Sequence, residues 1–188
     1  MTGGGGSSET YSYGALTLTI TSSTIIISAN MYFTGDLTVD TSELISGIKE
    51  YWDGKYDIDG KTYSLSVKIN VVDKKCQNCI IVNKYDAGGT SYTESLHNWS
   101  STKSRKVVIY TKWDDDDETS KDYAWTAAHE FGHCLGVYDY YKLSKAEMKA
   151  YPGRSNYVSI FNKRGTYAQI ADVKKVLVAF RTNTTQGW

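Results

Sequence analysis

The sequence has little that would direct it to a charged or lipid partner. Its 21 basic and 21 acidic residues leave no net charge over 188 residues, and no basic tract stands out, so we expect no nucleic-acid partner. The longest apolar runs, such as residues 24–27, are far too short to span a bilayer, which argues against a membrane partner. At this length we expect a single domain, and we expect it to act as a monomer.

The amino-terminal residues, MTGGGGSSETYSYG, lack the basic-then-apolar order of a secretory signal peptide. Residues 1–10 have the composition of a flexible leader, and residues 11–188 are expected to form the folded domain. There is one proline but 16 tyrosines, with many Ser and Thr residues, which suits a β-rich bacterial extracellular domain. We therefore expect a secreted protein, either trimmed from a longer precursor or exported as part of a larger one.

Cysteine is also scarce, with three residues. Cys76 and Cys79 form a C-x-x-C pair, but a cysteine-based structural zinc site needs a second pair, which the sequence lacks. Three interpretations of the pair remain open: free thiols, a disulfide closing a tight loop, or a redox motif without its usual βαβ context. Cys134 is expected to be a small buried hydrophobic residue.

Two of the three histidines lie in the stretch from His129 to Asp139, HEFGHCLGVYD. On a helix, residues four apart lie about 40° apart around the axis and ~6 Å along it, so His129 and His133 can bind one metal ion. Glu130 then lies beside the metal as a carboxylate that can transfer protons. Apolar neighbours would also fit an ordinary buried helix, but the H-E-x-x-H pattern predicts a hydrolytic zinc site.

The residues after His133 strengthen this prediction. Gly136 lies where a helix commonly ends in a left-handed residue, which glycine adopts without steric strain. A turn there directs the chain back towards the metal, so that Asp139 can supply a third ligand. Two other acidic residues are weaker candidates for the third ligand: Glu147 lacks a downstream helix motif, and Asp172 is expected at the surface of a closing helix.

The whole pattern, H-E-x-x-H-x-x-G-x-x-D, resembles that of the metzincin zinc peptidases, which usually ends in a third histidine. The aspartate form is similar to that of the snapalysin-type small bacterial neutral proteases. The resemblance implies an α+β domain with a twisted mixed sheet, a backing helix, a zinc-binding helix, and a small carboxy-terminal part with a closing helix. It places the boundary between upper and lower parts near residue 136. It also implies that the edge of a strand at residues 106–112 binds the substrate.

One turn departs from the family. Ser159-Ile160-Phe161-Asn162 is similar to the methionine turn beneath the metal, but Phe161 stands where methionine is expected. We expect Phe161 to form the apolar floor of the site. Lys163 stands where some families have a tyrosine, so no tyrosine ligand or oxyanion helper is carried over.

Hydrophobic periodicity and turn residues predict the remaining elements. These are two strands within residues 15–33, broken near Ser22-Ser23; a helix capped by Thr41 or Ser42 and ended by Asp53-Gly54; strands at 55–58 and 62–72 joined at Asp59-Gly60; strands at 80–83 and 106–113; and helices at 121–135, 144–150 and 166–180.

Two polar segments have open interpretations. Residues 84–104 are expected to form a long surface loop, and His97 within it is either a surface residue or a second source of ligand or substrate contact. The five acids from Asp114 to Glu118 form a solvated loop, a calcium site, or a patch that favours basic substrates.

The function predicted from the motif is hydrolysis of peptide bonds in a protein or peptide substrate. Zinc held by His129, His133 and Asp139 would activate water, and Glu130 would act as the general base. Two other functions remain possible: a protease effector or toxin domain of a larger exported protein, and a non-catalytic binding domain that keeps a structural zinc ion. An intact Glu130 argues against the last, because a structural site does not need a general base.

Overall fold

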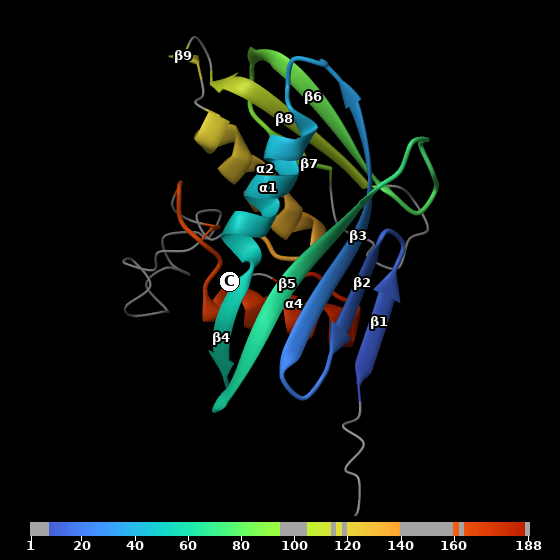
Figure 1. The fold of residues 1–188 in the computed structure, drawn as a ribbon, viewed down its shortest axis with the longest axis vertical. Helices are drawn as coiled ribbons and strands as arrows, with labels where there is room; N and C mark the ends of the chain where they lie inside the picture. Colours follow the sequence, from blue (N-terminus) through green and yellow to red (C-terminus); the bar gives the residue numbers. More distant parts are fainter. Residues whose placement is uncertain are drawn as a thin grey trace, which may run out of the picture.

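The computed structural model describes residues 8–94, 105–113, 116–117, 120–139, 160–161 and 164–186. These residues form a nine-stranded mixed sheet and three helices, and the fold belongs to the expected α+β class (Figure 1). Of the predicted features, the helix at 144–150, His97, Lys163 and Glu147 lie outside the described residues, as do residues 1–7. None of the described helices has both the length and the apolar character needed to cross a membrane.

The amino-terminal strands form an antiparallel meander. β1 (Glu9–Tyr13), β2 (Leu16–Ile20) and β3 (Thr24–Gly35) pair in order, with the predicted break between β2 and β3 near Ser22-Ser23. Buried and half-buried residues alternate along β2 and much of β3, so one face of the sheet is covered and the other is open to solvent. Because β1 begins at Glu9, residues 9 and 10 belong to the sheet and not to the expected leader.

The backing helix α1 (Thr41–Trp52) follows β3. Its amino-terminal cap is Asp40, whose side chain accepts a hydrogen bond from the Ser42 amide, so the predicted cap at Thr41 or Ser42 was wrong by one or two residues. The predicted hairpin then follows: β4 (Gly54–Ile58) and β5 (Lys61–Val71) are joined by Asp59 and Gly60, both with positive φ. β5 runs parallel to β3.

The other half of the sheet begins with β6 (Ile80–Gly88) and β8 (Arg105–Trp113), which extend it in parallel order from β3. Two short strands, β7 (Tyr92–Thr93) and β9 (Asp116–Asp117), pair antiparallel with the other side of β8. Two predictions are therefore corrected. Residues 84–94 are largely strand rather than loop, and the edge of β8 expected to be free for substrate is occupied by the protein's own chain.

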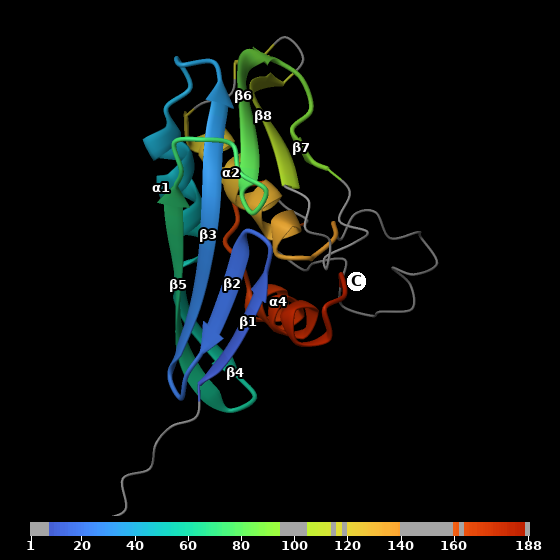
Figure 2. The ribbon, with the colours of Figure 1, turned by 90° about the vertical axis from the view of Figure 1, so that its right-hand side faces the viewer.

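All three described helices contribute to one hydrophobic core on the covered face of the sheet. α2 (Ser120–Cys134) packs against α1 so closely that a Cβ atom at Gly47 would lie 2.4 Å from the Ala124 carbonyl oxygen. This close crossing needs glycine, and on the sheet side α2 contacts β8 and β7. Figure 2 shows α2 and α4 on the same side of the sheet.

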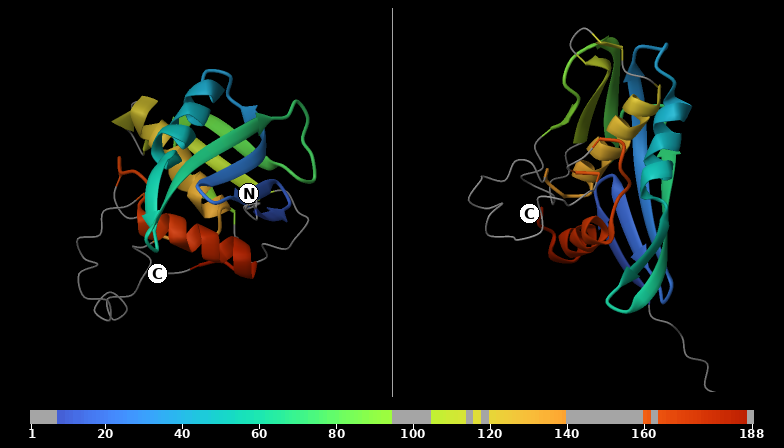
Figure 3. Two further views of the ribbon diagram at one scale, coloured as in Figure 1. Left: turned by 60° about the horizontal axis from the view of Figure 1, so that its bottom comes forward. Right: turned by 90° about the vertical axis from the view of Figure 1, so that its left-hand side faces the viewer.

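The closing helix α4 (Ile170–Thr182) lies under the lower half of the strands (Figure 3). It begins four residues later than predicted, because Asp172 closes its amino-terminal end: Asp172 Oδ2 accepts a hydrogen bond of 2.7 Å from the Gln169 amide. Asp172 is 0% exposed, so its predicted surface position was wrong. Tyr13 connects α4 to β1 through a 2.9 Å hydrogen bond to the Phe180 carbonyl.

Candidate metal centre

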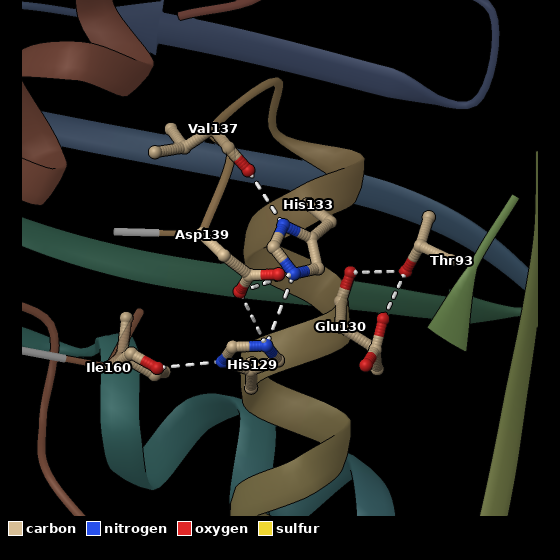
Figure 4. A network of polar contacts seen from close by, with 7 residues as sticks. All are labelled: Thr93, His129, Glu130, His133, Val137, Asp139 and Ile160. Carbon is tan, nitrogen blue, oxygen red and sulfur yellow. Dashed lines mark hydrogen bonds and ion pairs between the residues drawn. The ribbon is translucent and has the colours of Figure 1, made fainter. Parts of the chain in front are cut away.

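Helix α2 presents three potential metal ligands in its carboxy-terminal half. Potential ligand atoms of His129, Glu130 and His133 lie within 4.8 Å of one another, a grouping that can hold a metal ion. His129 and Glu130 are 8% and 4% exposed, and the side chains lie over the apolar core rather than in open solvent. The helical spacing of the motif therefore brings these groups together as the sequence predicted (Figure 4).

Asp139 joins the two histidines from beyond the helix. Gly136 has φ 91°, the left-handed conformation expected at the helix end, and the chain turns back so that Asp139 is only 4% exposed. Asp139 Oδ1 lies 3.1 Å from Nε2 of His129 and 3.1 Å from Nε2 of His133. The two Nε2 atoms are themselves 3.1 Å apart. Three potential ligand atoms thus form a nearly equilateral triangle, and Glu130 lies beside it.

Backbone carbonyls fix the orientation of both imidazole rings. Nδ1 of His129 lies 2.7 Å from the Ile160 carbonyl oxygen, and Nδ1 of His133 lies 2.7 Å from the Val137 carbonyl oxygen. A carbonyl oxygen only accepts, so each Nδ1 carries the hydrogen and donates it. In the neutral rings both Nε2 lone pairs then point at the carboxylate of Asp139, and three acceptors in contact repel one another unless a cation lies among them.

The local electrostatics also favour positive charge at this point. Burial by itself lowers the pKa of His133, but the protonated ring would donate a hydrogen bond to Asp139, and this bond and the charges of Glu130 and Asp139 outweigh burial and raise the pKa. Burial raises the pKa of Asp139, but the hydrogen bonds and positive charge that protonated imidazoles would supply outweigh burial, and the net pKa lies well below its usual value. The carboxylate is therefore ionised, and a metal cation can supply the positive charge that these groups favour.

Phe161 forms the floor beneath the histidines, as predicted from its position in the turn. It is 0% exposed, and its ring centroid lies 5.9 Å from that of His129 and 5.6 Å from that of His133. Its edge also meets Trp52, at 6.2 Å between centroids. An apolar ring thus supports both imidazoles, and this prediction is confirmed.

Gly132 makes room for that floor. A Cβ atom at Gly132 would lie 2.6 Å and 2.8 Å from two ring carbons of Phe161, and 2.9 Å from a ring carbon of Trp52. Real Cβ atoms do not approach other atoms so closely, and the two rings are buried on every side. Glycine between Phe131 and His133 is therefore a packing requirement of this site, which the sequence pattern alone did not reveal.

The turn that carries Asp139 is held by the end of the described chain. The Tyr138 amide donates to the Gln186 carbonyl at 3.0 Å, and the Gln186 amide donates to the Gly136 carbonyl at 2.7 Å. Val137 and Gln186 thereby form a short parallel bridge. Because the Val137 carbonyl accepts from His133, the same segment supports one histidine and presents the carboxylate.

Sequence reasoning missed Thr93, on β7. Its hydroxyl Oγ1 lies 2.7 Å from Oε2 of Glu130 and 3.0 Å from the Glu130 carbonyl oxygen (Figure 4). Thr93 lies 37 residues before Glu130 in a segment expected to be a loop, so no spacing rule could have connected them. Thr93 pairs with the buried Val107 of β8, and no local pattern in the sequence indicates this pairing.

The remaining candidate residues lie elsewhere or outside the described chain. Cys134 is fully buried, and burial raises the pKa of its thiol to about 12, so it is the inert hydrophobic residue expected. Cys76 and Cys79 form no disulfide, in contrast to the second of the three interpretations; the Cys76 amide donates to Sγ of Cys79, which donates to the Cys76 carbonyl. Asp116 and Asp117 form β9, and the calcium site at Asp114 to Glu118 stays a prediction.

Comparison with protein-family models and with curated proteins finds no match. Among solved structures, the chain is similar to the crystal structure of myroilysin, with a TM-score of 0.31 and 20% sequence identity over 84% of this chain. The match covers 62% of the myroilysin chain, so this chain spans less than two thirds of its length.

Proposed function

We propose that this protein is a zinc-dependent endopeptidase in which His129, His133 and Asp139 hold the ion and Glu130 is the general base. The observation that carries the proposal is the triangle of three buried acceptor atoms, each 3.1 Å from the others, with a carboxylate beside it that is not one of its corners. The motif and its resemblance to the metzincin peptidases give the reaction class.

The donor set fits zinc. Two imidazole nitrogens and one carboxylate oxygen are ligands that zinc commonly binds, and ligands at about 2.0–2.1 Å in a tetrahedron lie about 3.3–3.4 Å apart. The 3.1 Å edges of the triangle need only a small expansion to reach that spacing. When bound, zinc supplies a Lewis acid for the substrate carbonyl and lowers the pKa of a water molecule to about 7.

Glu130 carries the proton transfers. Thr93 donates a hydrogen bond to Oε2 of Glu130. The other carboxylate oxygen, Oε1, is then the one that accepts a proton from the attacking water. The same carboxyl group passes this proton to the amine that leaves when the peptide bond breaks. The buried position of Glu130, at 4% exposure, keeps bulk water from competing for the proton.

The substrate binds along β7 rather than along β8. Among the described strands β7 lies at the end of the sheet, beyond β8, and no described strand pairs with its outer side. An extended peptide can add there through main-chain hydrogen bonds. Because Thr93 of β7 contacts Glu130, a peptide on this edge lies close to the general base.

Hydrolysis of casein and of a peptide library by the purified protein tests the proposal. We expect cleavage that a zinc chelator abolishes and that added zinc restores. A protein that binds one zinc ion but cleaves nothing in the library would contradict the proposal and favour a structural zinc domain. Cleavage confined to a few proteins would keep the chemistry and favour an effector that acts on a restricted target.

A further inference from the structure

Thr93 is anchored at the edge of the sheet and faces the core side. It pairs with Val107 of β8, and the adjacent Glu94 amide donates to the Lys106 carbonyl at 2.9 Å. Alternation along β7 directs Tyr92, 47% exposed, to the outer face and Thr93 to the face that α2 covers. The backbone pairing of β7 with β8 thus fixes the position of Thr93 and of its short side chain.

The contact of Thr93 with Glu130 has one chemically consistent direction. An ionised carboxylate and a carbonyl oxygen only accept, so the hydroxyl hydrogen of Thr93 must be the donor. It can go to Oε2 at 2.7 Å or to the Glu130 carbonyl oxygen at 3.0 Å, and the shorter contact is to the charged acceptor. A β-branched side chain has few rotamers, so the donor is fixed in place before any substrate binds.

We propose that Thr93 is a positioning residue that holds the carboxylate of Glu130 in its productive rotamer. It thereby ties the general base to the strand on which the substrate lies. The inference rests on the proposed function. Glutamate has three rotatable side-chain bonds, and without Thr93 its carboxylate would sample orientations in which Oε1 points away from the attacking water. A displacement of about 1 Å at a reacting group can reduce the rate about 100-fold.

Two substitutions separate the hydroxyl from the shape of the side chain. Thr93→Val keeps the β-branched shape and removes the donor, whereas Thr93→Ser keeps the donor. We expect Thr93→Val to lower kcat about 10- to 100-fold with KM and zinc affinity within about twofold of wild type. Thr93→Ser should retain kcat within about threefold of wild type. Thr111→Val is the matched control, because its hydroxyl donates to Asp86 at 2.7 Å, outside the site.

A double-mutant comparison shows whether Thr93 acts through Glu130. In the Glu130→Gln background, Thr93→Val should lower the residual rate by less than about twofold, since the group that it positions is gone. A crystal structure of the zinc-loaded Thr93→Val protein should show the Glu130 side chain in more than one rotamer, a result that does not depend on activity.

Several outcomes would overturn the inference. These are wild-type kcat in Thr93→Val, an equal loss of rate in the Glu130→Gln background, or a loss of zinc affinity and melting temperature that explains the lower rate by itself. Failure of the proposed function has a different signature, because the zinc-loaded wild-type protein would then cleave no peptide.

Discussion

At the scale of single residues, Glu130 is the group whose chemistry can be tested with the least structural change. Glu130→Gln preserves the size of the side chain and an oxygen that can accept the hydroxyl of Thr93, but the amide does not accept a proton at neutral pH. We expect the variant to fold and bind zinc while losing more than about nine tenths of its turnover. Steady-state kinetics and zinc content measured on the same sample check this, and turnover above a tenth of wild type would contradict the assignment.

Gly132 and Phe161 should depend on each other. Alanine normally stabilises a helix relative to glycine by about 0.5–1 kcal/mol, but at position 132 its Cβ would meet the Phe161 ring at 2.6 Å. We expect Gly132→Ala to destabilise the protein by about 1–3 kcal/mol, a typical penalty for an overpacked core. Urea unfolding measures this difference.

Phe161→Met is the informative partner of that variant. By itself the substitution should reduce stability by less than about 1.5 kcal/mol, as an apolar swap of similar volume. It removes the two ring carbons that a Cβ at Gly132 would meet, so Gly132→Ala should be less destabilising in the Phe161→Met background. Simply additive effects would show that Trp52 or the backbone, rather than Phe161, demands the glycine.

These residues also show how far the sequence reaches. His129, Glu130, His133 and Asp139 follow one another at short, fixed separations, so helical geometry and one glycine turn are enough to bring them together. Thr93 and Ile160 reach the same site from distant parts of the chain, and their contacts depend on tertiary packing that no local pattern encodes. The site could therefore be predicted along α2 but not across it.

At the scale of elements, strongly patterned segments were predicted well and weakly patterned ones were not. The α2 bounds differ from the prediction by one residue, and the Asp59-Gly60 hairpin lies where its turn residues indicated. By contrast, β7 has only two residues and lies in a stretch rich in Gly, Ser and Thr, so its strand character comes from pairing with β8. Short edge strands of this kind are made by their neighbours rather than by their own propensity.

The segment that ends at Gln186 gives a prediction at this scale. Gln186→Pro removes the N–H that donates to the Gly136 carbonyl at 2.7 Å, and so loosens the turn that carries Asp139. One lost backbone hydrogen bond of about 0.5–1.5 kcal/mol corresponds to zinc binding weaker by about 2- to 12-fold. Competition with a chelating dye measures this affinity.

Gln186→Ala is the matched control for that experiment. It keeps the backbone N–H and loses only side-chain bonds to Thr184, so zinc affinity should remain that of wild type. Equal affinity in Gln186→Pro and wild type would mean that the turn holds Asp139 without help from the carboxy-terminal segment.

At the scale of the whole molecule, the proposed ion would link helix α2 to the turn that follows it. His129 and His133 belong to α2, which packs on α1 and the sheet, whereas Asp139 lies on the turn beyond the helix and next to the segment that follows α4. A ligand that binds the native state alone stabilises it by about 2.7 kcal/mol at a free concentration 100 times its Kd. For a protein of this size, that corresponds to a rise in melting temperature of about 5–10 °C.

Two variants, Glu130→Gln and Asp139→Ala, distinguish the residue that transfers protons from the residue that binds zinc. Zinc should raise the melting temperature of wild type and of Glu130→Gln by the same amount, because Glu130 is beside the triangle rather than one of its corners. Asp139→Ala should lose most of the rise and should release zinc on dialysis against a mild chelator, since two imidazoles alone hold the ion weakly. Full zinc occupancy in Asp139→Ala would move the third ligand elsewhere, with His97 the first residue to substitute. A rise lost in Glu130→Gln but kept in Asp139→Ala would exchange the roles of the two carboxylates.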